Sequence, residues 1–257
     1  MLNRQIQLLE YRITDLRNLE NLNQLKQFSG EDSNIQIITL NIEHLRIAKL
    51  DQEFHGLLSS VELLVPDGES IILLASLGSS HRDEEGTSKL VIKKYAGIDL
   101  CEDLIKIKQR ICFLGAEESV SKSLEEKFTR KFTEKDLYFQ HGYYDIEDEA
   151  EIMNRISAFK PDLLIVALGA PRQDFLINKY RQLFTNCIFI GVGGALDIFA
   201  AKLKRAPKIL IKLKLEWLYR ILQEPSRLLK LIPNFIYFLK LIFKLGLNKS
   251  SYSLSER

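Results

Sequence analysis

The sequence predicts an α/β protein whose doubly wound, mostly parallel, Rossmann-like sheet is followed by a basic helical C-terminal appendage. Short apolar runs of strand length alternate with segments of helical length from residue 35 to residue 192, which is typical of such a sheet. The runs 162–168 and 187–192 are almost continuously apolar, as expected for strands covered on both faces. Beyond residue 201 the chain is helical in pattern and basic. We therefore expect a catalytic domain over 1–201 and an appendage over 202–257.

Length and composition indicate an ordinary globular chain. The 257 residues are 46% hydrophobic and 27% charged, which excludes disorder and allows one large core or two small ones. The net charge of +2 hides an asymmetry, because residues 202–244 hold eleven Lys and Arg and two acidic residues. An acidic partner is expected there: phosphate, nucleic acid or an anionic membrane. Cys101, Cys112 and Cys187 form no CxxC pair, which favours buried free thiols in a reducing compartment.

No membrane-crossing or targeting segment is expected. The first eighteen residues are charged throughout and lack the apolar core of a signal peptide. The chain contains no uncharged apolar run of eighteen residues, which a spanning helix would need.

The first half begins with a polar helix over 12–29 and a strand over 35–40. Asn41 can then cap a helix, because its side chain can accept backbone N–H groups. A short helix over 52–58 leads to a strand over 62–65, which stops at Pro66-Asp67-Gly68, and a helix follows over 69–77. Residues 78–89 are a polar loop and the segment that we expect to be mobile.

The second half continues the alternation. The expected order is a helix over 97–108, a strand over 110–114, a helix from 115 to 128 and a strand over 138–140. A helix over 147–159, the strand 162–168, a helix over 172–183 and the strand 187–192 complete it.

Two glycine-ended strands mark candidate ligand loops, at residues 169–174 and 193–197. Ligands bind outside the carboxyl ends of strands in such sheets. Glycines such as Gly193 and Gly194 let backbone N–H groups approach a phosphate, and a helix start favours negative charge. Ordinary packing of helix on strand also requires glycine after a buried strand, so both interpretations remain open on the residues alone.

Several polar residues could carry chemistry at these strand ends, and each has a plainer alternative. Asp67 could be a general base, although Pro-Asp-Gly is also a common turn sequence. Thr39 could be an ordinary strand residue and Asn41 only a helix cap. Gln173 could be a surface helical residue, and Asp197 could only complement a helix dipole.

Metal and dinucleotide chemistry have little support in the sequence. The four histidines are scattered, and none forms a ligand pair with a cysteine. His141 could be a base, but a lone histidine is more often a structural hydrogen-bonding group. Walker and GxGxxG motifs are absent. We therefore expect no metal or other cofactor.

Together these pieces resemble the bacterial WecG/TagA/CpsF glycosyltransferases, which include N-acetylmannosaminyltransferases of teichoic acid and enterobacterial common antigen synthesis. The similar blocks occur in family order across about residues 35–227. They are TLN (39–41), LLVPDG (63–68), AGIDL (96–100), FLGA (113–116), HGYY (141–144), LGAPRQD (168–174), GVGGALDIFA (191–200), KRAP (204–207) and LEWLYRILQEPSR (215–227).

The resemblance implies an inverting, metal-independent transfer of a hexose-type sugar from a UDP-sugar to an undecaprenyl-diphosphate-linked sugar, in cell-surface polysaccharide or teichoic acid synthesis. The sugar could be N-acetylmannosamine, its uronic acid or glucose. By the matching blocks, Asp67 resembles the catalytic base, Thr39 the threonine that assists it, and Asn41 lies beside them. Gln173 and Asp197, with Gly193 and Gly194, resemble the nucleotide-binding residues.

The arginines Arg220 and Arg227, with Arg205 upstream, are similar to those that reach the diphosphate. The chain departs from the family at Lys94, where the family usually has Arg, and at Asp174, where it has Glu. Lys keeps the charge but not the bidentate fork of Arg, so a direct substrate contact by Lys94 is in doubt.

The resemblance and the basic, apolar C-terminal pattern together imply a cytoplasmic protein, peripheral on the inner face of the bacterial membrane. Packing on the sheet domain or a homo-oligomer contact are the alternatives for that segment. The competing functions are a non-catalytic nucleotide-sugar-binding regulator and a nucleic-acid-binding protein. The presence of Asp67 and Thr39 favours the enzyme over the regulator, and aromatics at mixed spacing in the appendage do not favour nucleic acid.

Overall fold

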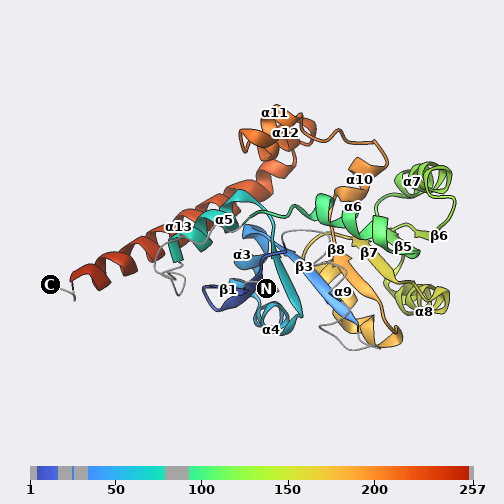
Figure 1. Cartoon of the computed structure of the whole chain (residues 1–257), viewed down its shortest axis with the longest axis horizontal. Helices are drawn as coiled ribbons and strands as arrows, with labels where there is room; N and C mark the ends of the chain where they lie inside the picture. The colour runs from blue at the N-terminus through green and yellow to red at the C-terminus, as the bar shows by residue number, and fades with distance from the viewer. Residues whose placement is uncertain (1–4, 17–24, 26–33, 79–92, 255–257) are drawn as a thin grey trace.

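The structure, a computed structural model, describes residues 5–16, 25, 34–78 and 93–254. Its centre is a six-stranded sheet in the order β4-β3-β8-β7-β5-β6, and every neighbouring pair of strands is parallel. Figure 1 shows this sheet with helices on both sides. The strands are β3 (Ile35–Leu40), β4 (Leu63–Pro66), β5 (Arg110–Gly115), β6 (Asp136–Gln140), β7 (Leu163–Ala167) and β8 (Ile188–Gly191). The doubly wound α/β fold is confirmed.

Both faces of the sheet are covered because its central strands are apolar at successive positions. All six residues of β3 are buried, as are all four of β8. One face packs against α6 (Gly97–Ile107), α7 (Glu118–Lys131) and α10 (Ala195–Phe199). The other face packs against α3 (Ile42–Leu50), α4 (Gln52–Ser60), α5 (Glu69–Gly78), α8 (Glu149–Phe159) and α9 (Arg172–Tyr180).

The three cysteines are free and buried in these layers, as the sequence indicated. Burial raises the pKa of the Cys112 thiol well above its usual value, so this sulfur lacks the thiolate character that reactive cysteines need.

The helix expected directly after Gly115 begins later, at Glu118. Gly115 has a φ of +134°, and a Cβ there would lie 2.4 Å from the Ala167 carbonyl oxygen. Ala116 is also left-handed, with φ +59°. The chain needs this tight turn to clear the neighbouring strand β7 before a helix can start.

The prediction of a helix over 12–29 is wrong at its start. Residues Gln5–Leu8 and Tyr11–Thr14 instead form an antiparallel hairpin, β1 and β2, in which Leu8 pairs with Tyr11. The hairpin buries Leu8, Tyr11 and Ile13 against α3, α4 and α5. Most of the remainder of 12–29 lies outside the described residues, as does the loop expected over 78–89, apart from Gly78.

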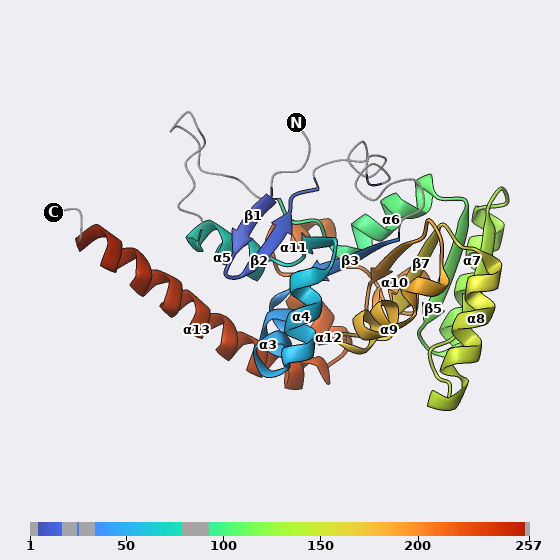
Figure 2. The same ribbon diagram turned by 90° about the horizontal axis from the view of Figure 1, so that it is seen from below.

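The C-terminal segment is helical, as expected, and consists of α11 (Lys208–Lys212), α12 (Glu216–Gln223) and α13 (Arg227–Leu254). Helix α13 packs on the hairpin side of the domain through Leu241, which is 6% exposed, and through Tyr237, Phe238, Ile242 and Leu245. Figures 1 and 2 both show its C-terminal part projecting beyond the rest of the molecule. In the described part of the chain, no helix combines the length and the apolar character that a membrane span requires.

Candidate active site at the carboxyl edge of the sheet

The predicted site residues follow four neighbouring strands at one edge of the sheet. The strand order β4-β3-β8-β7 brings the segments after these strands into one row. Asp67 follows β4, Thr39 lies in β3, Gly193 follows β8 and Gln173 follows β7. Parallel strands all present their carboxyl ends at the same edge, which is where ligands bind in such sheets.

Asp67 lies between the end of β3 and the chain that leads into α6. Its N–H donates to the Leu40 carbonyl at 2.8 Å, and its carboxylate accepts the backbone N–H of Gly97. The residue keeps some exposed surface, but burial of its carboxyl group raises the pKa of Asp67 above its ordinary value. The positive charges of Lys94 and Arg220 and the Gly97 N–H oppose this shift, and Glu216 adds to it. A carboxylate with a raised pKa is a better proton acceptor.

Thr39 is buried in the strand that pairs with β4, with 6% of its surface exposed. Its register partner in β4 is Val65, two residues before Asp67. Thr39 Oγ1 donates to the Gly191 carbonyl at 3.3 Å, and a Cβ on Gly97 would come within 3.3 Å of the Thr39 side chain. Thr39 therefore joins β3 to β8 and packs under the turn that presents the Gly97 N–H.

Asn41 is the N-cap of α3, the plainer of its two expected roles. Its Oδ1 accepts the backbone N–H of Glu43 at 2.9 Å and of His44 at 3.2 Å. The His44 ring reaches back to accept the Asn41 N–H at 3.4 Å. The other ring nitrogen of His44 lies 3.6 Å from Asp174 Oδ2, with both side chains buried. The first turn of α3 is thus linked to α9 through the contact between His44 and Asp174.

Gln173 shapes both glycine loops instead of lying on the surface. The side chain is 3% exposed, and its Oε1 accepts the N–H of Gly169 at 3.2 Å and of Gly193 at 3.0 Å. A Cβ on Gly191 would collide with the Gln173 amide at 2.5 Å. These two N–H groups, expected to face a phosphate, are therefore satisfied by Gln173.

Two side chains border the turn at Gly193 and Gly194. Arg227 covers it, since a Cβ on Gly194 would lie 2.9 Å from Arg227 Nη2. The Asp197 carboxylate lies on the same turn, 3.8 Å from that Cβ position. Burial raises the pKa of Asp197, opposed chiefly by the positive charge of Lys202. A guanidinium and a carboxylate thus flank this loop.

Arg220 of α12 interacts electrostatically with both Asp67 and Arg227. The negative charge of Asp67 acts on it from one side and the positive charge of Arg227 from the other. Burial is the largest cause of the lowered pKa of Arg220, and the charge of Arg227 adds to it. Arg220 is largely shielded from water, whereas the Arg227 side chain is 36% exposed and its Nε lies 2.6 Å from Glu224 Oε2. Two guanidinium groups held close together suit an anion with more than one charge.

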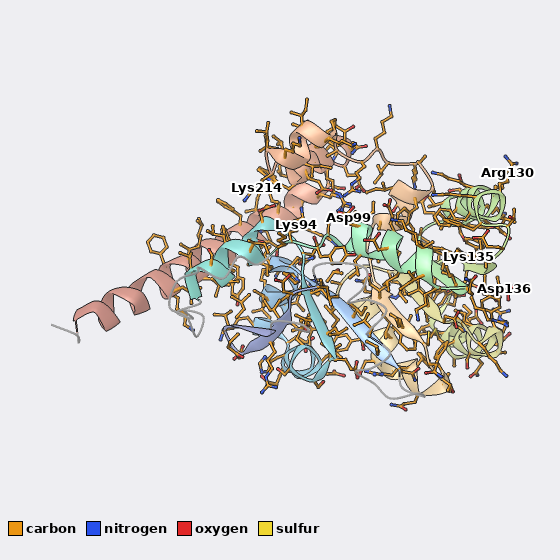
Figure 3. The ribbon with its side chains drawn as sticks, viewed as in Figure 1. Lys94, Asp99, Arg130, Lys135, Asp136 and Lys214 are labelled. Atoms are coloured by element: carbon orange, nitrogen blue, oxygen red, sulfur yellow. The ribbon has the colours of Figure 1, made fainter. Side chains whose placement is uncertain are left out.

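Lys94 and Arg205 are paired with carboxylates. Lys94 Nζ lies 3.3 Å from Glu216 Oε2 at the start of α12. Arg205 Nη2 lies 2.6 Å from Asp99 Oδ1 in α6, so its guanidinium is engaged away from the Gly193 turn. Figure 3 shows Lys94 and Asp99, with Lys214, on the side of the molecule where α11 and α12 lie.

His141 lies apart from this group, after the opposite edge strand β6. It lines an open pocket of about 680 Å³ together with Tyr143, Tyr144 and residues of α8. Among the described residues, no three His, Cys, Asp or Glu side chains gather as metal ligands would.

Sequence reasoning missed three contributors to the site. Glu216 lies in the block LEWLYR, yet no motif rule assigns a role to a carboxylate at the start of a helix. The N–H of Gly97 and the buried contact between His44 and Asp174 join segments far apart in the chain. Only the placement of β4 beside β3, and of α9 beneath α3, brings them to the site.

Comparison with known proteins gives one consistent result. The family model described as the glycosyl transferase WecG/TagA/CpsF family matches residues 6–251. A Bacillus spizizenii protein is 33% identical over 207 residues, covering 78% of this chain and 76% of that protein. Proteins of Staphylococcus aureus strains MW2 and NCTC 8325 are each 32% identical over 227 residues, covering 85% of both chains. All three are named N-acetylglucosaminyldiphosphoundecaprenol N-acetyl-beta-D-mannosaminyltransferase.

Proposed function

Because this chain belongs to the WecG/TagA/CpsF glycosyltransferase family, we propose that it transfers a hexose-type sugar from a UDP-sugar to undecaprenyl-diphosphate-linked N-acetylglucosamine. The acceptor is the one that the names of its relatives specify. N-acetylmannosamine is the donor sugar that these names favour over its uronic acid or glucose. The product belongs to cell-surface polysaccharide or teichoic acid synthesis.

The observation that carries this proposal is the position of Asp67 in one row with two arginines. Asp67 accepts the proton of the acceptor hydroxyl as the hydroxyl oxygen attacks the anomeric carbon. The bond between that carbon and the diphosphate oxygen breaks, and UDP leaves with the electron pair. Attack from the face opposite the leaving group inverts the anomeric configuration. Thr39 supports the reaction by fixing β3 against β8 beneath the carboxylate.

The leaving diphosphate needs its developing charge stabilised. Arg220 and Arg227 supply the stabilising positive charge, because guanidinium groups bind phosphate oxygens bidentately. Arg220 lies near Asp67, and Arg227 lies at the Gly193 turn. Arg205 can join them after leaving Asp99. Lys94 contributes positive charge beside Asp67. We propose that no metal ion is required, since side chains of this chain hold the compensating charge.

The nucleoside of the donor binds against the two loops that Gln173 holds together. Asp197, half-buried on the second loop, offers a carboxylate to hydroxyl or N–H groups of the nucleoside. Asn41 follows β3, next to Asp67 in the row, and lies on the acceptor side with its side-chain oxygen held in the cap of α3.

We propose that α12 and α13 hold the protein on the inner face of the membrane, where the lipid-linked acceptor resides. Five exposed apolar residues of α13 recur at spacings of three and four, so they share one face of the helix. They are Leu228, Ile232, Phe235, Leu239 and Phe243, between 39% and 71% exposed. The packed residues Tyr237 and Leu241 lie on the opposite side. An apolar stripe flanked by Lys240 and Lys244 suits an anionic lipid surface.

One assay tests the function. The full-length protein is given a panel of UDP-sugars with a short-chain polyprenyl-diphosphate-N-acetylglucosamine, and released UDP is measured. Release with one UDP-sugar, dependent on the acceptor, supports the transferase. Binding of a UDP-sugar with no product from any acceptor would instead indicate a non-catalytic regulator.

A further inference from the structure

Glu216 forms an ion pair at the centre of the site that the proposed chemistry does not use. It is the first residue of α12, and its Oε2 lies 3.3 Å from Lys94 Nζ. The two side chains are 17% and 24% exposed, so both are largely shielded from water. Fully exposed pairs contribute little, whereas a shielded pair beside a reacting group influences the charge that the group experiences.

Two carboxylates, Asp67 and Glu216, interact with the same positive charges. Asp67 is surrounded by Lys94, Arg220, Glu216 and the Gly97 N–H. Arg220 is in turn surrounded by Arg227, Glu216, Asp67 and Glu224. Glu216 is therefore a second carboxylate facing the same two cations as Asp67. A cation that is held by one carboxylate is less available to the other.

This competition matters because a general base must be free to take a proton. A carboxylate closed onto an ammonium group is held in its charged form and accepts a proton less readily. Lys94 pairs with Glu216, and the negative charge of Glu216 raises the pKa of Asp67. Both effects leave the Asp67 carboxylate more basic than it would be facing Lys94 alone.

We propose that Glu216 is a positioning residue for the transfer reaction, which draws the Lys94 ammonium away from Asp67 and leaves that carboxylate free to accept the acceptor proton. This inference rests on the proposed function for its catalytic consequence. Its electrostatic content, that Glu216 controls the proton affinity of Asp67 through Lys94, does not depend on turnover. The two parts can therefore be measured separately.

The test uses Glu216→Gln, Glu216→Asp and a matched control, Glu69→Gln, in the full-length protein. Glu69 Oε2 pairs with Lys214 at 2.9 Å, so the control removes another ion pair between the domain and the C-terminal segment. Aspartate carboxyl carbons are labelled with ¹³C, the Asp67 signal is assigned with Asp67→Asn, and its titration midpoint is compared. The pH dependence of kcat/KM is measured on the same proteins.

In Glu216→Gln we expect the Asp67 midpoint and the acid limb of kcat/KM to move to lower pH, because a negative charge that raises the pKa of Asp67 is removed and Lys94 is released. The plateau rate should fall several-fold, because a weaker base drives proton transfer less. Glu216→Asp should restore both in part, and Glu69→Gln should leave the midpoint where it is. An unchanged or higher Asp67 midpoint in Glu216→Gln overturns the inference, as does an equal shift in Glu69→Gln. If the parent protein released no UDP, the transferase proposal would fail, and the carbon titration would still decide the role of Glu216.

Discussion

Gln173 Oε1 accepts the N–H of Gly193 at 3.0 Å. Gln173 lies in the segment after β7, and Gly193 lies in the segment after the neighbouring strand β8. The same oxygen accepts the N–H of Gly169 at 3.2 Å, so one amide group sets the spacing of two loops. Any side chain at position 191 would displace this amide, because its Cβ would lie 2.5 Å from Gln173 Nε2. The shape of the proposed donor site therefore depends on a side chain that is itself 3% exposed.

Replacing Gln173 or Asp197 with Ala should weaken UDP binding more than it slows the chemical step. Each hydrogen-bonding group that a change removes is worth about 0.5–1.5 kcal/mol, or roughly a 2- to 10-fold rise in Kd for each group lost. Calorimetric titration with UDP measures this, with Gln52→Ala on the exposed surface of α4 as the control. If both variants bind UDP as tightly as the parent, the donor site lies elsewhere.

Asp67→Asn should keep the fold and UDP binding and lose most turnover. The amide has nearly the shape of the carboxylate but cannot accept the acceptor proton, and loss of a general base typically costs about 10²–10⁴ in rate. The measurement is UDP release at saturating donor and acceptor. Asp145→Asn, an exposed carboxyl near the opposite edge of the sheet, is the control and should leave the rate unchanged. Parent-like turnover in the Asp67 variant would remove this residue from the mechanism.

The acid limb of the kcat/KM profile should lie above the range of an ordinary aspartate. Burial raises the pKa of Asp67, and the base is active only when deprotonated. Activity is therefore present above the raised pKa and is lost as pH falls through it. An unperturbed aspartate would keep the base active to about pH 4. A limb at or below that value would show that the base is another group, or that Asp67 is well solvated.

Transfer should persist in EDTA. The compensating charge is supplied by Arg220, Arg227 and Lys94, so a chelator should leave the rate within about twofold, whereas loss of an essential metal would cost several kcal/mol of transition-state stabilisation. UDP release is measured after dialysis against EDTA and again with added Mg²⁺ or Mn²⁺. Loss of activity that either ion restores would refute this expectation.

Phe235→Gln together with Phe243→Gln should weaken binding to anionic liposomes and leave the fold unchanged. These side chains are 55% and 71% exposed, and burying an apolar side chain contributes up to about 1.5–3 kcal/mol. Flotation should therefore weaken at least tenfold, and added salt should weaken it further. Leu50→Gln, 77% exposed on α3, is the matched control. Equal flotation of the double variant and the parent would remove α13 from the membrane contact.

Substitution is a cleaner test than removing the C-terminal segment. A chain ending near residue 200 would lack all of α11, α12 and α13. In the structure, Leu241 and its neighbours pack onto the hairpin, α3 and α5. Truncation would expose that apolar surface, so loss of activity could reflect instability rather than loss of a membrane contact.

The sequence alone determined the alternation of strands and helices, because strands buried on both faces leave continuous apolar runs that hardly any other structure requires. The runs at 162–168 and 187–192 correspond to β7 and β8 within one residue at each end. The sequence also marked Asp67, Gln173 and Gly193 as residues at strand ends. It missed the hairpin β1–β2, although Leu8, Tyr11 and Ile13 alternate with polar residues, because leucines at spacings of three further on favoured a helix.

Only the tertiary structure decided which of these residues act together and what each one faces. The N-cap at Asn41 was readable, but its support by His44 and Asp174 joins segments 130 residues apart. Glu216 could not be assigned a role until α12 was placed against Lys94. The order of strands in the sheet is set by long-range packing and not by local propensity. Charged groups on separate elements therefore meet their partners only when the whole chain has folded. The pKa of Asp67 is likewise raised only in the folded protein.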